Sequence, residues 1–311
     1  MTALICGSMA FDTIMVFEDR FKNHILPDQV HILNVSFLVP TLRREFGGCA
    51  GNIAYNLNLL GGEGRPMATV GQDFSPYAEW MDNTGVSRQS LKVLADDYTA
   101  QAYITTDQDD NQITAFHPGA MNLSHLNTVT DESGITIGIV SPDGRQGMIE
   151  HADQFSEAGI PFIFDPGQGM PMFDGEDLNR FLKQATWLTL NDYEFQLFSE
   201  RTGKNAEEIA REVDALVITR GAEGSIIHAN NQEMTIPIAK INQLKDPTGC
   251  GDAYRAGLLY GLMNDMDWET TGRLAATMGA CKIEVNGTQN HTPTRDEIGE
   301  RFKLDFDYLP W

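Results

Sequence analysis

The sequence predicts an α/β fold in which helices cover a mostly parallel central sheet, and a smaller β-sheet lid is attached to it. First, short apolar runs typical of buried strands alternate with longer amphipathic runs typical of helices. Second, several strand-like runs end in Gly or Asp, and ligands of such sheets bind beyond those strand ends. Third, two segments interrupt the alternation and are rich in β-branched and aromatic residues.

The elements of the large domain follow from separate stretches of sequence. Strands are expected where the apolar runs are short, at 3–7, 67–71, 135–140, 161–165, 186–190 and 215–221. Helices are expected where apolar residues recur at helical spacing, at 51–61, 76–85, 177–185 and 207–213. Because the two kinds of element alternate, we expect the strands to run parallel.

The two interrupting segments, 13–46 and 98–118, predict the lid. The first contains VHILNVSFLV at 30–39, and the second is typical of a β-hairpin that turns through Asp107–Asn111. No linker divides the chain. The large domain is therefore expected to comprise 1–12, 47–97 and 119–311.

Charge limits the class of partner. The 311 residues carry a formal net charge of −22, with no basic cluster beyond Arg43-Arg44, which argues against a polymeric nucleic acid. Small phosphorylated ligands remain compatible with this charge, because backbone amides at a helix N-terminus can hold phosphate locally.

Cysteine spacing and hydropathy indicate where the protein works. The four cysteines lie far apart and lack metal-site spacing, which favours reduced thiols in the cytoplasm. The N-terminus lacks the basic region of a signal peptide, and no apolar run approaches the ~18 residues of a membrane helix. We therefore expect a cytoplasmic protein with no membrane partner.

The stretch KDPTGCGDAYRAGLLYGL, at 245–262, changes from a glycine-rich turn into a helix. The amides of Gly249, Cys250 and Gly251 would then point out of the helix N-terminus and could hold an anion. Asp252 could accept a proton from a hydroxyl that attacks a phosphoryl group held there. It could equally stabilise the start of the helix, and spacing alone does not decide between these roles.

A second glycine-rich turn precedes a helix in FGGCAGNIAYNLNLLGG, at 46–62. Glycines allow the backbone to approach a ligand closely, and Asn52 could bind a polar small molecule; alternatively, the turn only feeds a packed helix. The chain contains neither GxGxxG nor GxxxxGK[ST], so the dinucleotide-binding and P-loop classes are not supported.

Three further polar or aromatic positions allow a functional and a structural interpretation. Asn191 and Glu194 could reach a hydrated Mg²⁺, but Asn and Glu at this spacing also form a helix capping box. Asp12 follows the first strand and could bind a vicinal diol, or it could be a surface turn residue. Phe116 offers a stacking surface, although an aromatic residue in a strand usually packs in the sheet.

The order of these motifs along the chain resembles that of the PfkB, or ribokinase-like, family of carbohydrate and nucleoside kinases. The matching stretches are GGCAGNIAYNLNLLGG, NDYE and DPTGCGDAYRAGLLYGL; GSMAFDTIMVFEDRF, VSFLV and FHPGAM make the sequence most similar to bacterial adenosine kinases. The resemblance covers about residues 5–290. It implies a ribokinase-like three-layer α/β/α domain with a mostly parallel central sheet and a small β-sheet lid.

The resemblance also implies roles for the matching residues. Asp252 corresponds to the catalytic base, and the anion hole for the transferred phosphoryl group corresponds to Gly249, Cys250 and Gly251. The nucleoside would contact Ser8, Asp12, Phe37, Gly48, Asn52, Phe116 and Gln168. ATP would contact Asn191, Thr219, Gly221, Gly249, Gly251, Asn286 and Gly287. Mg²⁺ would be held through water by Asn191 and Glu194, and K⁺ near Asp246 and Thr248.

Together these roles imply an ATP-dependent nucleoside 5′-kinase, with adenosine kinase, which converts adenosine and ATP to AMP and ADP in purine salvage, as the first expectation. The family also implies a homodimer formed through the lid. The alternatives are a broad nucleoside kinase that takes inosine and guanosine, a sugar kinase for ribose or fructose, and a non-catalytic sensor. Ala102 and the single glutamine Gln168 leave a roomier base pocket, which puts adenosine exclusivity in doubt.

Cys250 stands where the family often has Ala or Val. A thiol at a helix N-terminus can have a lowered pKa and become reactive. Alternatively, the position only requires a small side chain.

Overall fold

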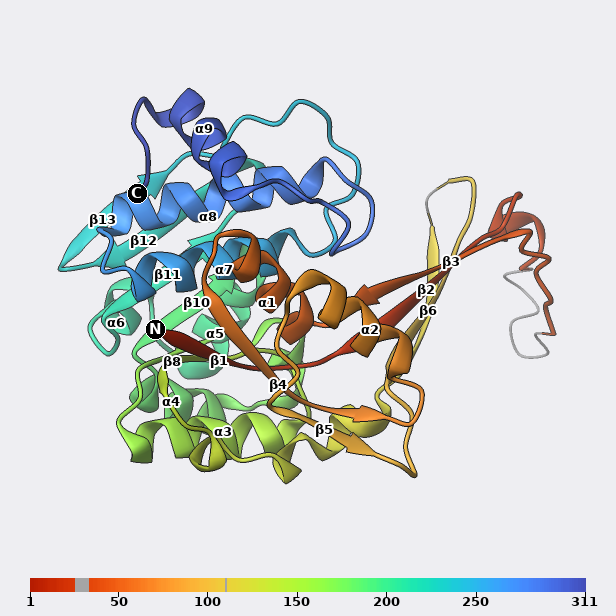
Figure 1. Cartoon of the computed structure of the whole chain (residues 1–311), viewed down its shortest axis with the longest axis horizontal. Helices are drawn as coiled ribbons and strands as arrows, with labels where there is room; N and C mark the ends of the chain where they lie inside the picture. The colour runs from red at the N-terminus through yellow and green to blue at the C-terminus, as the bar shows by residue number, and fades with distance from the viewer. Residues whose placement is uncertain (26–33, 110) are drawn as a thin grey trace.

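The computed structural model describes residues 1–25, 34–109 and 111–311, which form a large layered domain and a smaller sheet that projects from it (Figure 1). Over these ranges, no helix has both the length and the apolar character needed to span a bilayer.

The large domain is built on a central sheet. Within the described residues its strands are, in chain order, β1 (Thr2–Cys6), β4 (Glu63–Gly71), β5 (Leu91–Leu94), β8 (Ile135–Val140), β9 (Phe162–Phe164), β10 (Trp187–Asn191), β11 (Ala215–Thr219), β12 (Ser225–Ala229) and β13 (Gln232–Ile236). Their spatial order is β13-β12-β11-β10-β9-β8-β1-β4-β5. Pairing is parallel from β5 to β11, and β12 and β13 add an antiparallel edge.

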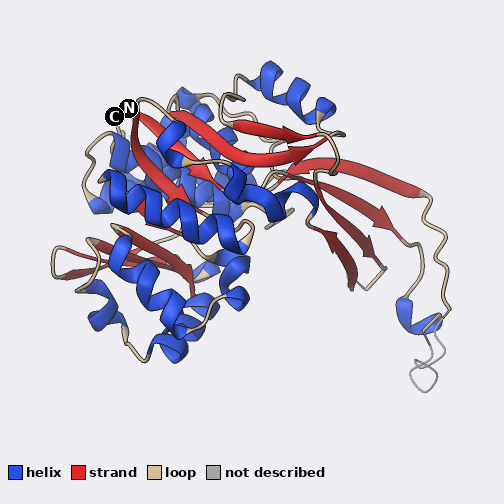
Figure 2. Ribbon diagram, turned by 90° about the horizontal axis from the view of Figure 1, so that it is seen from below, coloured by secondary structure: helices blue, strands red, loops and turns tan. Residues whose placement is uncertain are grey.

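Helices cover both faces of this sheet and give three layers (Figures 1 and 2). One core packs the sheet against α1 (Cys49–Leu59), α2 (Ser75–Thr84), α7 (Cys250–Met263), α8 (Trp268–Ile283) and α9 (Arg295–Phe306). The other core involves α3 (Arg145–Ala158), α4 (Gly175–Gln184), α5 (Asp192–Thr202) and α6 (Ala206–Ala210). Helices α7 and α8 lie against each other because Gly257 and Gly261 have no Cβ, which would overlap Ala275 and Thr271.

The projecting sheet contains β2 (Ala10–Val16), β3 (Thr41–Gly47), β6 (Ala100–Thr106) and β7 (Gln112–His117) in the order β3-β2-β6-β7 (Figure 2). Strands β2 and β6 pair in parallel, and the outer pairs are antiparallel. We call these strands the lid. The predicted α/β class with a mostly parallel sheet and a small second sheet is confirmed.

Most predicted elements are present, with two differences. The expected strand at 30–39 is wrong in its described part, because 34–40 are irregular and the strand of this segment is β3; Pro40 has no N–H for a sheet ladder. Residues 30–33 lie outside the described residues, as does Asp110 of the predicted hairpin turn. Asp12 lies inside a lid strand instead of in a loop, because β2 already begins at Ala10. The division of the chain into domain ranges remains a proposal.

Candidate active site

The start of α7 presents open backbone amides, as its glycines predict. Gly249 caps the helix with φ of 79°, a left-handed conformation that favours glycine, and Gly251 is exposed. Among the described contacts, the amide of Cys250 donates to Pro247 O at 3.1 Å, whereas the amides of Gly251 and Asp252 have no protein acceptor. This helix end can therefore receive an anion.

Asp252 lies beside these amides, in the first turn of α7. Its half-buried carboxylate accepts a hydrogen bond from Asn52 Nδ2, on α1, at 2.8 Å. Burial raises the pKa of Asp252 to about 6, although the bond from Asn52 opposes the rise. A carboxylate with this pKa is ionised at neutral pH and is more basic than an ordinary aspartate, which suits proton acceptance.

A buried network holds Asn52 in position, and the sequence analysis missed it. Gln289 Nε2 donates to Asn52 Oδ1 at 3.0 Å and to Tyr77 Oη at 2.6 Å, while Trp80 Nε1 donates to Gln289 Oε1 at 2.9 Å. Tyr77 Oη in turn donates to Gly47 O at 2.9 Å. The network fixes the amide of Asn52 with its Nδ2 toward Asp252. No local motif marks Gln289, because its partners lie more than 200 residues away.

An ion pair anchors α7 to the end of β9. Arg255 Nη2 lies 2.9 Å from Asp165 Oδ1, and both side chains are buried. Burial disfavours the charge of Arg255, but the nearby Asp165 outweighs this and raises its pKa. This pair ties α7, just after its first turn, to the residue that follows β9, and the sequence analysis did not identify it.

Asn191 and Glu194 form the capping box of α5. Asn191 Oδ1 accepts from the amide of Glu194 at 2.7 Å, and Glu194 Oε2 accepts from the amide of Asn191 at 2.8 Å. The structural interpretation of this motif is thus confirmed. The pKa of Glu194 is raised, first by burial and then by the charge of Asp165.

Asp12 and Phe116 share one face of the lid. Asp12 pairs with Ala102 across β2 and β6, and Ala102 pairs with Phe116 across β6 and β7, so these side chains point the same way. Asp12 lies against Gly47, where a Cβ would be 2.6 Å from its Oδ2. Burial, followed by the charges of Glu45 and Asp246, raises its pKa to about 6. Phe116 is 52% exposed, so it is available to stack on a ligand instead of packing in a core.

Ser8 and Gly48 support the start of α1. The backbone oxygen of Ser8 accepts from the amide of Ala50 at 3.0 Å, and its Oγ accepts from the amide of Cys49 at 3.1 Å. Gly48 has φ of 88°, and a Cβ there would lie 2.5 Å from Ser8 O. Ser8 is buried, so the structure gives it a supporting contact instead of a place on an open pocket wall.

Two predicted nucleoside contacts lie outside this cluster. Phe37 packs with Phe17 and Phe21 at ring-centroid distances of 4.8 and 5.1 Å, just beyond the end of β2, so the structure does not bring it to Asp252. Gln168 is exposed in the loop after β9.

A cavity of about 410 Å³ adjoins the start of α7. Thr219, the last residue of β11, and Gly221, just after this strand, line it together with Cys250 and Gly251, so these predicted ATP and anion-hole residues lie together. Asn286 and Gly287 do not line it. The amide of Gly287 instead donates to Asp246 Oδ2 at 2.9 Å, and the amide of Thr248 donates to Asp246 Oδ1 at 2.9 Å.

The structure gives no support for a lowered pKa of Cys250. Burial raises the pKa of its thiol to about 11, and the nearby Lys282 opposes only part of this rise. The alternative, a position that needs a small side chain, fits the cavity wall.

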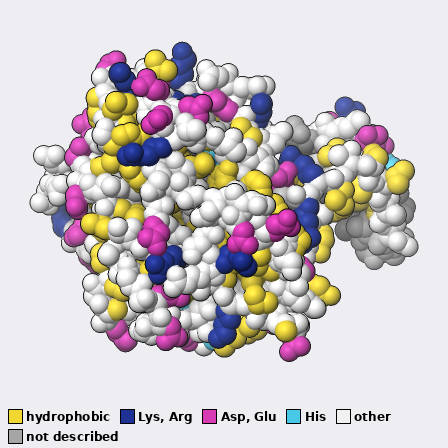
Figure 3. Space-filling view, in the orientation of Figure 1, with side chains coloured by type: hydrophobic (Ala, Val, Ile, Leu, Met, Phe, Trp, Pro, Cys, Tyr) yellow, Lys and Arg dark blue, Asp and Glu magenta, His cyan; other side chains and the backbone are white. Residues whose placement is uncertain are grey.

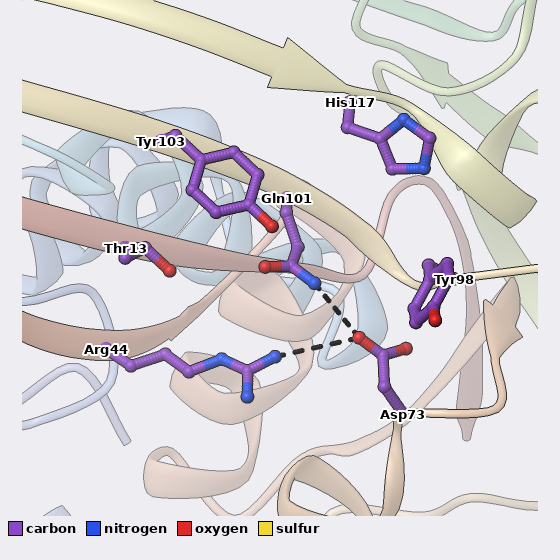
Figure 4. Close-up of a pocket in the computed structure, with 7 residues that line it drawn as sticks. All are labelled: Thr13, Arg44, Asp73, Tyr98, Gln101, Tyr103 and His117. Atoms are coloured by element: carbon purple, nitrogen blue, oxygen red, sulfur yellow. Dashed lines mark hydrogen bonds and ion pairs between the residues drawn. The ribbon is translucent and has the colours of Figure 1, made fainter.

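A second hollow lies on the opposite face of the lid (Figure 4). Thr13 pairs with Arg44 and Tyr103, one position along from Asp12, so these side chains point away from the Asp12 face. Asp73, from the large domain, accepts from Gln101 Nε2 at 3.0 Å and lies 3.7 Å from Arg44 Nη2. These contacts tie the lid to the large domain rather than forming part of the reaction site.

The fold and the site define a phosphotransferase of the ribokinase-like class. A family model described as "pfkB family carbohydrate kinase" matches residues 13–295. The chain therefore belongs to this family, and it is a kinase that acts on a hydroxyl group. The predicted family resemblance is confirmed.

Several proteins similar to this chain are described as nucleoside kinases. A nucleoside kinase of Methanocaldococcus jannaschii is 31% identical over 273 residues, which cover 87% of this chain and 89% of that protein. The structure of Burkholderia thailandensis nucleoside kinase in complex with inosine is 54% identical, with a TM-score of 0.90 and 99% of each chain covered. A second structure of the same kinase is described as a complex with ADP-inosine. Its chain is 56% identical, with a TM-score of 0.88, and the match covers 99% of this chain and 97% of that one.

Proposed function

We propose that this kinase transfers the γ-phosphoryl group of ATP to the 5′-hydroxyl of nucleosides, and that it accepts inosine as well as adenosine. The observation that carries this proposal is the position of Asp252: its carboxylate is held by Asn52 and lies next to the open amides of α7. The 54% identity to a nucleoside kinase whose structure contains inosine supports a nucleoside as the acceptor.

Each part of the site has a role in an in-line transfer. The 5′-hydroxyl gives its proton to Asp252 as its oxygen attacks the γ-phosphorus and the bond to the β-phosphate oxygen breaks. The open amides of Gly251 and Asp252, at the start of α7, stabilise the charge on the transferred group. Asp12 accepts hydrogen bonds from the ribose hydroxyls, and Phe116 stacks on the base. ADP and a nucleoside 5′-monophosphate result, a reaction suited to purine salvage.

Broad acceptance follows from the walls of the base site. Ala102, which pairs with Phe116, contributes only a methyl group on this face of the lid. This small side chain leaves room for more than one base and favours a broad nucleoside kinase over an enzyme restricted to adenosine.

Mg²⁺ fits the region around Glu194 as a water-held ion. Burial, and then the charge of Asp165, raises the pKa of Glu194, and a divalent cation near this carboxylate would favour its ionised form. Over the described ranges, no group of three or more His, Cys, Asp or Glu residues is arranged to hold a metal directly. Mg²⁺ commonly keeps its waters and binds to substrate phosphates. Bound there, it would neutralise phosphate charge, while Asn191 and Glu194 would orient its waters.

The lid surface supports the proposal of a homodimer. The lid projects from the large domain and carries exposed apolar side chains, which Figure 3 shows in yellow. Leu42 is 61% exposed and Ile113 is 44% exposed. A second copy that covered these strands would remove this surface from water.

The four free cysteines fit the reducing cytoplasm that we propose as the location.

An ADP-release assay across adenosine, inosine, guanosine, ribose and fructose tests the function. We expect turnover with adenosine and inosine, with kcat/KM at least about 100-fold above that of either sugar, because base contacts are lost with a free sugar. Turnover with a free sugar alone would contradict the nucleoside assignment, and turnover with adenosine alone would contradict the broad one. Absence of turnover with all five would favour the non-catalytic alternative.

A further inference from the structure

A buried lysine lies directly behind the turn that begins α7. Lys282, in the last turn of α8, has none of its surface exposed, which is rare for lysine unless its charge is paired. Its Nζ donates to Asp246 O at 2.7 Å and to Val285 O at 3.1 Å, and lies 3.9 Å from Asp246 Oδ2. The ammonium is therefore surrounded by oxygen atoms.

These oxygens are of the kind that bind a hard cation: two backbone carbonyls and one carboxylate. The family resemblance places K⁺ near Asp246 and Thr248, beside these atoms. Lys282 already satisfies them with a covalently attached positive charge. Its place at the C-terminal end of α8 also favours a cation, because the helix dipole is negative there.

Asp246, which lies against Lys282, also holds the turn that precedes α7. The carboxylate of Asp246 accepts from the amides of Thr248 and Gly287, so it joins the turn before α7 to the loop after α8. Cys250 follows within this turn, and its amide donates to Pro247 O. A charge that holds Asp246 in place therefore also holds the direction of the open amides.

We propose that the Lys282 ammonium takes the place of a monovalent cation in this kinase, positions the turn at Gly249–Gly251, and makes phosphoryl transfer independent of K⁺. Lys282 is a positioning residue: it acts through Asp246 and touches neither substrate. This inference rests on the kinase activity proposed above.

The first experiment uses the wild-type enzyme. Nucleoside phosphorylation is measured with 0 to about 100 mM KCl, with tetramethylammonium chloride added to keep the ionic strength constant. We expect kcat to change less than about twofold across the series. A K⁺-dependent rise of tenfold or more would overturn the proposal. A wild-type melting temperature that rises saturably with K⁺ but not with tetramethylammonium would also overturn it, and this measurement needs no acceptor.

The second experiment removes the charge while keeping the chain length. In Lys282→Met we expect kcat to fall about 10- to 100-fold, with little change in the nucleoside KM, because the amides lose their alignment. K⁺ or NH₄⁺ should restore part of kcat and raise the melting temperature of this variant alone. Lys245→Met is the matched control, since Lys245 is exposed one residue before Asp246, and it should behave as wild type.

The outcomes separate the proposal from a general structural role and from the proposed function. A Lys282→Met enzyme that keeps full kcat without K⁺ would contradict the proposal, as would a loss that neither ion restores. If Lys282→Met does not fold, Lys282→Gln, which removes the charge but keeps a polar side chain and the Asp246 carboxylate, is tested in the same way. If the wild type phosphorylates no nucleoside, the proposed function fails, and the melting-temperature comparison still tests Lys282.

Discussion

The turns that begin α1 and α7 are both glycine-rich, but they use their backbone differently. At α1, Ser8 accepts hydrogen bonds from the amides of Cys49 and Ala50. At α7, the amides of Gly251 and Asp252 have no protein acceptor among the described contacts. A glycine-rich turn therefore does not by itself indicate an anion site; the contacts of its amides decide.

The two helices contribute complementary chemistry to one site. Helix α1 supplies a side chain, Asn52, which is held by Gln289 and donates to Asp252. Helix α7 supplies open amides and the carboxylate beside them. The proposed acceptor site thus depends on α1 for side-chain orientation, and the proposed phosphoryl site depends on α7 for backbone geometry.

The largest effect is expected for Asp252→Asn, which removes the base but keeps the size of the side chain. We expect kcat to fall about 10²- to 10⁴-fold with little change in the KM of nucleoside or ATP. Wild-type kcat/KM should rise with pH through about 6, because Asp252 must be ionised to accept the proton. Steady-state measurements of kcat and KM across pH 5–8 test both expectations. An Asp252→Asn enzyme that keeps its kcat would contradict the role of Asp252 as the base.

The next two substitutions compare the turns before α1 and α7 directly, because each adds one methyl group to one turn. Gly251→Ala should keep most of its stability, since the new Cβ meets only the guanidinium end of Arg255, at 3.3 Å. However, kcat should fall roughly 10- to 100-fold as the methyl group crowds the proposed phosphoryl site. Gly48→Ala should lose about 1 to 3 kcal/mol of unfolding free energy, because φ is 88° and Ser8 O lies 2.5 Å from the new Cβ.

Urea denaturation and kinetics on both variants distinguish these outcomes. If Gly48→Ala kept its stability while Gly251→Ala unfolded, the assignment of a structural turn at α1 and an open turn at α7 would be reversed.

A smaller effect is expected for Gln289→Leu, which frees Asn52 from its buried network. Tyr77 and Trp80 also lose a hydrogen-bond partner, so stability should fall by about 1 to 3 kcal/mol. We expect nucleoside kcat/KM to fall about tenfold while the KM for ATP stays unchanged, because only the α1 side of the site is disturbed. An equal rise in both KM values would show that the two helices are not separable in this way.

Local features of the sequence predicted the parts of the site that depend on neighbouring residues. The glycines before α7, the aspartate that follows them and the capping box at Asn191 are all read within a few positions. The parallel sheet followed from the alternation of apolar runs. These predictions needed no knowledge of which distant segments meet.

Features that depend on distant contacts could not be predicted in the same way. Asn52 and Asp252 are 200 residues apart, and their hydrogen bond exists only in the fold. Gln289 lies in an irregular stretch after α8, and Lys282 resembles an ordinary basic residue in the last turn of a helix. The strand of this segment, β3, was predicted too early in the chain, because the apolar residues before Pro40 resemble a strand more than its actual sequence, TLRREFG, does.

The smallest effect is expected on the free energy of unfolding, which decreases when Asp252 is ionised. Its pKa is raised from 3.8 to about 6, so ionisation opposes folding, and the free energy of unfolding is reduced as pH rises from about 4 to above 6. In Asp252→Asn this cost is absent. Because the carboxylate is only half-buried, we expect the variant to be more stable than wild type by about 1 to 2 kcal/mol at pH 8, with the difference shrinking toward pH 5.

Urea denaturation of the ligand-free protein at pH 5 and pH 8 measures this difference. Asp96→Asn is the control, because Asp96 is exposed and should show no pH-dependent gain. The sign of the result bears on the comparison of the two turns. A cap that stabilised α7 would lose stability on substitution, as Ser8 holds α1 by accepting its amides, whereas a carboxylate kept for proton transfer gains stability when its charge is removed. Equal or lower stability of Asp252→Asn at pH 8 would therefore place Asp252 with the structural caps.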